Sequence, residues 1–381
     1  MFSEVKKKLG FGCMRLPMTN GEVDLEQFKE MVDYFIGEGF NYFDTAHGYL
    51  DGKSELAIRD GLTSRYPRDR YVLTNKLTEE YFKKEEDIRP FFQNQLEWCG
   101  VDYFDFYLMH AQNATNYEKF KKCHAYETAF ALKKEGKVHH VGISFHDKAA
   151  VLDRILTDYP EIEIVQIQFN YVDYESASVE SRKVYEVARK HGKPVLVMEP
   201  VKGGNLVKLP EAAQKIFDEC NAAEGTSYSN ASYAIRFAAG FEGMCSVLSG
   251  MSNLEQLKDN TAYMKEFRPL NETEHKAVMD VCEVFAGLDM IPCTSCHYCV
   301  EENHCPKEIR IPDLFACLNS KNVFNDWNAV FYYNAILTVD GHGKASDCIG
   351  CAGCEKVCPQ HLEIRELLKK VAAEFEKGKE E

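Results

Sequence analysis

The sequence has little that would tie it to a membrane or to nucleic acid. It contains no continuous apolar run of about 18 residues, the length that a membrane-spanning helix needs. Its first residues, MFSEVKKKLGFGCM, lack the apolar core of a secretory signal peptide. Acidic residues outnumber basic ones, so the formal net charge is −15 at pH 7 and the pI is near 5.4. We therefore expect a cytoplasmic protein with no membrane and no nucleic acid as partner.

A further absence bears on the fold. The run Gly-x-Gly-x-x-Gly, which an open dinucleotide-binding sheet carries directly after a strand, does not occur. Short apolar strands still alternate with amphipathic helices, which predicts a parallel sheet. The predicted strands are residues 8–16, 41–44, 71–77, 105–110, 138–145, 164–170, 194–200 and 244–251. The predicted helices are residues 24–39, 54–62, 85–100, 117–135, 147–158, 176–191, 229–240 and 254–265. Eight repeats favour closure into a (β/α)8 TIM barrel.

The length of the chain allows more than the barrel. At 381 residues it exceeds one average domain, and an apolar content of 45% is enough for a sizeable core. We expect the TIM barrel over residues 1–267 and a helical linker over 268–290. A small, mainly helical domain should follow over 291–381, ending in a charged helix.

Three successive predicted strands end in a titratable residue. Asp44 ends the run NYFD, Lys76 ends VLTNK and His110 ends DFYLMH, while Tyr49 follows Asp44 by one loop. In a barrel of this kind, the C-terminal ends of the strands form the face that carries the chemistry. Each residue alone is more often a cap or a solvated charge, but together they predict a catalytic set. His47 lies in the loop before Tyr49, and the sequence leaves open whether it contacts the substrate or has a structural role in the loop.

With their flanking words FDTAHGY, TNK and LMH, these four residues resemble the catalytic tetrad of the aldo/keto reductases. The resemblance covers roughly residues 8–265. It implies that Tyr49 donates a proton to a carbonyl that accepts a hydride, and that the Lys76 ammonium lowers the phenol pKa. Asp44 would keep Lys76 charged, and His110 would hold the substrate oxygen.

The resemblance also implies a nicotinamide site at the barrel mouth, for NADP or NAD. Ser144 and Gln166 would hold the carboxamide. Phe145 stands where the family often has Asn, and Met198 where a Tyr commonly stacks on the ring. Because of these departures, a flavin in or near the barrel mouth is an alternative cofactor. Further cofactor contacts are expected from Gly12, Cys13 and Met14, which would pass beneath the cofactor.

The segment SGMSNLEQLKDN resembles the adenosine-phosphate end of the same site. A loop that leads into a helix N-terminus is a favourable place for phosphate. Many family members have Lys and Arg where this chain has Gly250 and Gln256, so NADP and NAD stay open. A plain helix cap is the competing interpretation. The candidate residues are Gly250, Ser252, Gln256, Asp259 and Asn260.

Eight of the fifteen cysteines form two tight motifs late in the chain. The second motif, C-x2-C-x2-C-x3-C-P, matches the bacterial ferredoxin ligand run, and the first has two extra residues before its last Cys. The fourth Cys of such a motif ligates the other cluster. We therefore predict two [4Fe–4S] clusters, one on Cys293, Cys296, Cys299 and Cys358, and one on Cys348, Cys351, Cys354 and Cys305. Zinc, which prefers two separated C-x2-C pairs, fits this spacing less well.

The residues around the motifs support a helical ferredoxin-like module, because 311–320 and 326–338 have helical patterns. The remaining seven cysteines, such as Cys99 and Cys282, should be buried small apolar residues. A disulfide framework is disfavoured, because it would spread the cysteines and need export.

Hydride carriers and one-electron clusters exchange electrons through a device such as a flavin. The combination predicts an oxidoreductase that reduces a small carbonyl compound with NAD(P)H. Its clusters would exchange electrons with a partner protein or stabilise the structure. The alternatives are a redox-sensing or scaffold subunit that binds nucleotide without turnover, and a flavin-linked electron-transfer enzyme.

Overall fold

The computed structural model describes residues 2–176, 179–301, 303, 305–324, 329–339 and 341–376. The chain divides into two compact units. The first unit contains the residues up to Val201 together with Ala231–His275, and the second contains Lys202–Asn230 and the residues from Lys276 onward. Parts of three predicted segments lie outside the described residues, namely 177–178, 326–328 and 377–381.

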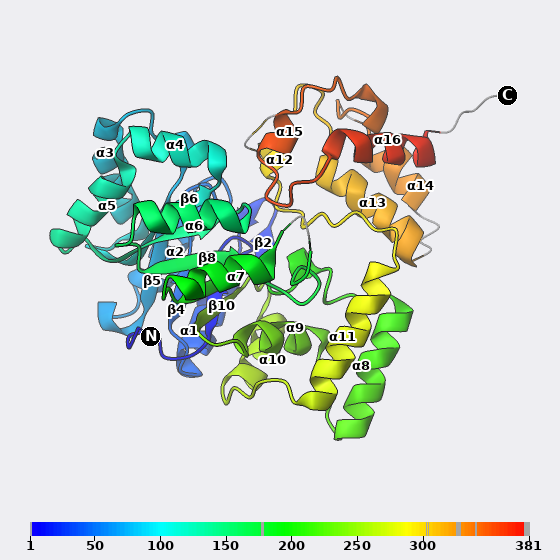
Figure 1. Cartoon of the computed structure of the whole chain (residues 1–381), viewed down its shortest axis with the longest axis horizontal. Helices are drawn as coiled ribbons and strands as arrows, with labels where there is room; N and C mark the ends of the chain where they lie inside the picture. Colours follow the sequence, from blue (N-terminus) through cyan, green and yellow to red (C-terminus); the bar gives the residue numbers. More distant parts are fainter. Residues whose placement is uncertain are drawn as a thin grey trace. The chain divides into compact units, whose positions relative to one another are not determined.

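Eight parallel strands of the described first unit close into a barrel, in the order β1-β10-β9-β8-β7-β6-β5-β4 (Figure 1). The strands are β1 (Leu9–Gly12), β4 (Tyr42–Asp44), β5 (Val72–Leu77), β6 (Phe104–Gln112), β7 (Val138–Phe145), β8 (Ile164–Gln168), β9 (Val195–Met198) and β10 (Met244–Ser249). The helices between them are α1 (Leu25–Gly37), α2 (Lys53–Ile58), α3 (Glu85–Cys99), α4 (Ala114–Lys122), α5 (Ala125–Lys134), α6 (Ala149–Asp158), α7 (Ser181–Lys190), α9 (Asn230–Ala239) and α10 (Leu254–Met264). The predicted TIM barrel is confirmed.

Local sequence explains why these elements form. In β5 all six residues are buried, as expected for a strand covered on both faces. Helix α1 begins at Asp24, whose side chain accepts a hydrogen bond from the Gln27 backbone N–H at 3.1 Å. Its apolar face, which includes Phe28, Val32 and Phe35, is buried. The bounds of β5 and α1 therefore lie within two residues of the predicted ones, whereas β1 ends earlier and α7 starts later than predicted.

The structure differs from the prediction at three elements. The single helix expected over 117–135 is two helices, because His124 adopts a left-handed φ of 51° between α4 and α5. A small antiparallel hairpin, β2 (Met18–Thr19) and β3 (Glu22–Val23), was not predicted, since two-residue strands show no period. Helix α8 (Glu211–Glu224) was also missed, and it belongs to the second unit.

The described part of the second unit is helical and has its own core. Its helices are α8, the part of α11 (Glu272–Ala286) from Lys276 onward, α12 (Tyr298–Glu301), α13 (Ile311–Phe324), α14 (Ala329–Tyr332), α15 (Gly353–Lys356) and α16 (Ile364–Phe375). Short turns include η4 (Lys202–Gly204) and η5 (Tyr333–Leu337). Phe315, Leu314 and Leu368 are buried in this core, and Tyr333 stacks on Phe375 with ring centroids 4.7 Å apart. The predicted helical C-terminal region is confirmed.

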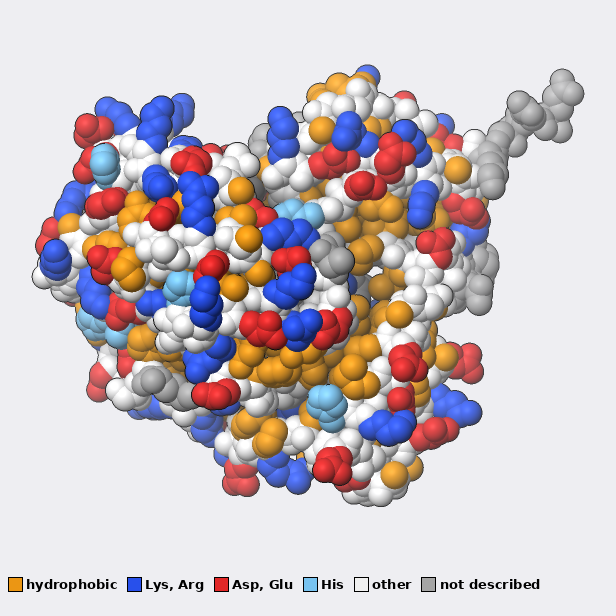
Figure 2. Space-filling view, viewed as in Figure 1, with side chains coloured by type: hydrophobic (Ala, Val, Ile, Leu, Met, Phe, Trp, Pro, Cys, Tyr) orange, Lys and Arg blue, Asp and Glu red, His pale blue; other side chains and the backbone are white. Residues whose placement is uncertain are grey.

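Two surface properties complete the description. No helix among the described residues is long and apolar enough to span a bilayer. On the face drawn in Figure 2, basic and acidic side chains are interspersed, and no large basic patch is visible there.

Candidate active site and cysteine-lined cavities

Three residues of the predicted catalytic set lie on three adjacent barrel strands, and the fourth, Tyr49, lies in the loop that follows β4. Asp44 is the last residue of β4, Lys76 lies near the end of β5, and His110 lies in β6. The Lys76 Nζ atom is 2.6 Å from Asp44 Oδ1, 2.9 Å from the Thr45 carbonyl oxygen and 3.0 Å from the Tyr49 hydroxyl oxygen. An ammonium has three N–H donors, and these three acceptors match them.

The Asp44–Lys76 pair is buried, with side-chain exposures of 5% and 0%. Burial raises the pKa of Asp44, and the nearby Lys76 charge opposes that shift. Burial also lowers the pKa of Lys76, and the Asp44 charge opposes it. Gln166 Nε2 donates to the second carboxylate oxygen of Asp44 at 3.1 Å. Each charge is therefore compensated by hydrogen bonds inside the barrel.

The ring of His110 lies edge-to-face with the ring of Tyr49. The two ring centroids are 6.0 Å apart. Burial, followed by the charges of Lys76 and His146, holds the pKa of His110 well below its usual range, so the imidazole is neutral. Its Nδ1 atom is 2.7 Å from Thr78 Oγ1. Thr78 is not predicted as a site residue from the sequence, although its position two residues after Lys76 is a usable signal.

The contacts of His47 favour a structural role over a substrate contact. Its Nδ1 atom is 2.6 Å from Glu55 Oε2, and its ring stacks on Trp98 with centroids 4.3 Å apart. Glu55 is fully buried and also accepts from Asn75 Nδ2 at 2.8 Å. These contacts favour the structural interpretation, in which His47 anchors the loop that carries Tyr49.

The expected nicotinamide contacts are neighbours in the sheet. Ser144 of β7 and Gln166 of β8 are register partners. Ser144 Oγ accepts from the Ala111 backbone N–H at 2.8 Å. Met198 pairs with Gln168, one strand further along the barrel.

The residues expected beneath the cofactor follow β1. Gly12 pairs with Asp44 in the sheet, and the Cys13 backbone N–H donates to the Asp44 carbonyl oxygen at 2.8 Å. Cys13 is buried and Met14 half-buried. This strand end therefore meets the strand end that carries the proposed carboxylate.

The expected phosphate contacts are engaged in capping α10. The Asn253 side chain accepts from the Gln256 N–H at 2.9 Å, and Gln256 Oε1 accepts from the Ser252 N–H at 2.8 Å. Asn260 is buried and bonds Ser249 and Tyr263. Asp259 is half-buried. Ser252 and Gln256 thus lie at the start of α10, whereas Asp259 and Asn260 lie within the helix. Gln256 and Asn260 both bond protein partners.

Arg15 is a cation near this helix start that was not predicted as a site residue from the sequence. Its side chain lies over Gly250, where a Cβ would stand 3.3–3.5 Å from three of its carbons. Its carbonyl oxygen accepts from Ser252 Oγ at 3.1 Å. The signal was weak, because Arg15 and Gly250 are far apart in the sequence.

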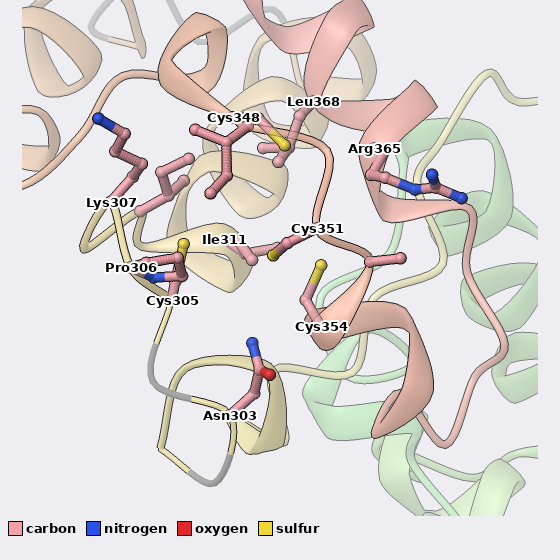
Figure 3. A pocket seen from close by; sticks show the side chains of 13 residues that line it. Asn303, Cys305, Pro306, Lys307, Ile311, Cys348, Cys351, Cys354, Arg365 and Leu368 are labelled. Carbon is pink, nitrogen blue, oxygen red and sulfur yellow. The ribbon is translucent and has the colours of Figure 1, made fainter.

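The eight motif cysteines gather around two cavities of the second unit. One, of about 330 Å³ including open solvent, is lined by Cys305, Cys348, Cys351 and Cys354 (Figure 3). The other, of about 320 Å³, is lined by Cys293, Cys296, Cys299 and Cys358. Ile311 lines both. The grouping is the interleaved one that ferredoxin spacing implies.

The two motifs repeat one backbone conformation. A left-handed residue follows the first cysteine by two positions, at Ser295 (φ 51°) and Gly350 (φ 72°). Another follows the second cysteine directly, at His297 and Ala352. A third follows the Cys-Pro cysteine by three positions, at Glu308 and His361. Non-glycine residues adopt this conformation at a cost of about 1–3 kcal/mol each, so its repetition points to a shared functional demand.

The donor sets fit iron–sulfur clusters. Each cavity has four thiol groups, the number that binds a [4Fe–4S] cluster. Among the described residues, no group of three or more His, Cys, Asp or Glu is placed to hold a single metal ion. A tetrahedral zinc site would need four sulfur atoms about 2.3 Å from one ion.

Comparison with known proteins identifies two families along the chain. The model of the aldo/keto reductase family matches residues 8–283, and the model of the 4Fe-4S dicluster domain matches residues 292–362. Among curated proteins, the NADH-specific methylglyoxal reductase of Escherichia coli is 25% identical in an alignment 219 residues long that covers 52% of this chain and 65% of that protein. Norsolorinic acid reductase B of Aspergillus parasiticus is 30% identical over 36% of this chain and 39% of its own length. The match thus spans less than two thirds of each relative.

Solved structures resemble the barrel. An aldo-keto reductase from Klebsiella pneumoniae in complex with NADPH has a TM-score of 0.58 at 21% identity, covering 72% of this chain and 94% of that chain. The holo form of an aldo-keto reductase from Bacillus halodurans has a TM-score of 0.58 at 22% identity, covering 72% and 92%. At these identities the likeness establishes the fold.

Proposed function

The chain belongs to the aldo/keto reductase family and carries a fused 4Fe-4S dicluster domain, and on that premise we propose that it reduces a small carbonyl compound with NADPH or NADH. The observation that carries the proposal is the 3.0 Å contact between Lys76 Nζ and the Tyr49 hydroxyl, inside a buried ion pair with Asp44. A phenol needs such a neighbour to act as an acid near neutral pH.

Proton transfer follows from the directions of these hydrogen bonds. Lys76 can only donate, so the Tyr49 oxygen accepts from it, and the phenol hydrogen can be given to a substrate oxygen. When that proton leaves, the ammonium stabilises the phenolate that remains. Asp44 holds Lys76 in place and compensates its charge.

His110 would orient the substrate. A neutral imidazole donates from one nitrogen and accepts at the other. If the Thr78 hydroxyl donates to Nδ1, the hydrogen resides on Nε2, where it can bind a carbonyl oxygen. Tyr49 and His110 would then hold the same oxygen from two sides.

A bound nicotinamide would supply the hydride. Ser144, Gln166 and Met198 would hold its ring, and Gly12, Cys13 and Met14 would lie beneath it. Ser252 and Arg15 are candidate contacts for its phosphates. Since relatives include an NADH-specific enzyme and a structure with NADPH, both nucleotides are candidates. A flavin remains an alternative, because Phe145 and Met198 depart from the usual ring contacts.

The second unit would hold two [4Fe–4S] clusters, each on one of the two cysteine groups. Such clusters supply one-electron transfer when bound. A partner protein that donates or accepts electrons is therefore part of the proposal. The support is the two cavities with four cysteines each and the repeated backbone conformation.

The test is a turnover assay on anaerobically purified protein, with a panel of small carbonyls that begins with methylglyoxal and with both nucleotides. The Tyr49→Phe variant keeps the ring and removes the hydroxyl, and should lose about 10²–10⁴-fold in kcat/KM. Tyr66→Phe is the matched control, because the Tyr66 hydroxyl bonds Asp33 at an exposed site. Tyr66→Phe should keep full activity.

Three results would contradict the proposal. Tyr49→Phe with wild-type activity would exclude the phenol as the acid. Wild-type protein that binds nucleotide but turns over no carbonyl, even with one-electron donors, would favour the sensing or scaffold alternative. Bound flavin in the purified protein would favour the flavin-linked alternative.

A further inference from the structure

We propose that the turn Lys202–Asn205, which follows β9, is a positioning element of the cysteine site at Cys293, and that loading this site orders the turn. The proposal rests on the proposed function in one respect, namely that the Cys293 cavity holds an iron–sulfur cluster. It adds that this site needs residues outside the cysteine motifs. Within the second unit, the turn and the Cys293 loop are in direct contact.

Two contacts join the turn to the loop. Asn205 Nδ2 donates to the Cys293 carbonyl oxygen at 3.0 Å. Gly203 lies directly against the next residue, Thr294, because a Cβ on Gly203 would stand only 2.2 Å from the Thr294 carbonyl oxygen. Thr294 is 2% exposed, so it has little room to move away. Both contacts fall on the first ligand of the motif and its neighbour.

The start of the same loop is held by α13. The Asn319 side chain bonds Ile291 twice, accepting from its N–H at 2.8 Å and donating to its carbonyl oxygen at 2.7 Å. The segment from Ile291 to Thr294 is thus held at its start by α13 and at its end by the turn. The Ser295 N–H then donates to the Cys293 sulfur at 3.5 Å. A fixed loop of this kind presents Cys293 in one position.

Glycine is required at position 203 for two separate reasons. Its φ is +66°, a conformation that favours glycine. Any side chain would also collide with Thr294. Gly225, at the end of α8, has nearly the same φ of +64°, but a Cβ added there would have no other atom within 4 Å. A comparison of the two positions separates backbone strain from the collision.

The turn also lies close to the barrel in the sequence, since Lys202 comes four residues after Met198, the end of β9. Lys202 has a positive φ of 49° and Glu199 one of 53°. Such non-glycine conformations persist where surrounding contacts impose them. The contacts that Gly203 and Asn205 make with the Cys293 loop constrain the turn next to Lys202, and their removal should loosen it.

The experiment uses the full chain, purified anaerobically as wild type, Gly203→Ala, Asn205→Leu and the control Gly225→Ala. Iron and sulfide are counted, and EPR spectra of the reduced proteins are compared with those of Cys296→Ser and Cys351→Ser. Wild type and Gly225→Ala should hold about eight irons per chain, and Gly203→Ala about four. The Gly203→Ala spectrum should match that of Cys296→Ser and differ from that of Cys351→Ser. Asn205→Leu should lose iron from the same site faster than wild type on exposure to a chelator.

Hydrogen exchange provides the second measurement. In wild type, amide exchange across residues 202–206 should rise at least tenfold when iron is removed, while exchange in β5 stays unchanged. The proposal is overturned if Gly203→Ala and Asn205→Leu keep full iron and the wild-type spectrum. It is also overturned if amide exchange across residues 202–206 is the same with and without iron. Wild-type protein that contains no iron would instead contradict the iron–sulfur clusters of the proposed function. Should Gly203→Ala not fold, Asn205→Leu and the exchange measurement still decide.

Discussion

Thr78 Oγ1 and His110 Nδ1 lie 2.7 Å apart, and both side chains are buried at the C-terminal end of the barrel. The imidazole is neutral, because burial and the Lys76 charge keep its pKa well below the usual range. A neutral imidazole has two tautomers, and its partner at Nδ1 selects between them. Thr78 is therefore placed to decide whether Nε2 can donate to a substrate oxygen.

We predict that Thr78→Val lowers kcat/KM about tenfold, since it removes one hydrogen bond worth about 1 kcal/mol and frees the ring to adopt the other tautomer. Thr78→Ser keeps the hydroxyl and should restore most of the activity. The ¹⁵N chemical shifts of His110 check the tautomer without turnover. Identical shifts in wild type and Thr78→Val would contradict the prediction.

We predict that Asp44→Asn destabilises the first unit by about 3–5 kcal/mol, because it leaves the Lys76 ammonium buried without its counter-charge. The double variant Asp44→Asn/Lys76→Met should recover much of that stability, since no charge remains buried. Activity should be lost in both. Urea unfolding and kcat measured on the same samples test this opposite behaviour, and a double variant less stable than Asp44→Asn would argue against it.

We predict that Arg236→Met destabilises the first unit by about 3–5 kcal/mol. Arg236 and Glu274 form a buried two-point ion pair with N–O distances of 2.7 and 2.6 Å, and it joins α9 to the start of α11. Arg89 and Glu135 form the same two-point pair at an exposed position. Arg89→Met should therefore cost less than about 1 kcal/mol. If both variants lose the same unfolding free energy in urea, burial of the ion pair does not control the cost of removing its arginine.

We predict a pH-dependent contribution from His140, whose ring bonds Glu4 at 2.7 Å and Glu163 at 2.9 Å. Burial lowers the pKa of His140, but the bond and charge of Glu163 and the charge of Glu4 outweigh it, so the net pKa is raised. The stabilisation is therefore fully present below the unfolded pKa of about 6.5 and disappears as the pH rises through the folded pKa.

Urea unfolding of wild type and His140→Gln over about pH 5 to 9 measures this contribution. The difference in unfolding free energy should be largest at the acidic end and shrink toward the basic end. His139→Gln is the control, because His139 is exposed on the opposite face of the same strand. A difference that grows with pH would refute the assignment.

Several features could be predicted because they depend on short stretches of chain. The barrel strands carry apolar runs, and Asp44, Lys76 and His110 stand at strand ends that a parallel barrel must bring to one face. The cysteine groups follow from spacing alone, because three thiols at i, i+3 and i+6 suit one cluster. The split of α4 from α5 was missed, since the left-handed His124 has no sequence signature.

What the sequence alone determined is the identity of the elements and of their reactive side chains, because periodicity and spacing are local properties. Only the tertiary structure decided which distant groups meet. Thr78, directly after β5, bonds His110 of the neighbouring strand β6. Arg15 lies over Gly250, and Gly203 lies against Thr294, although the residues of each pair are far apart in the sequence. Such contacts arise when the barrel closes and the second unit packs its core, and no local pattern encodes them.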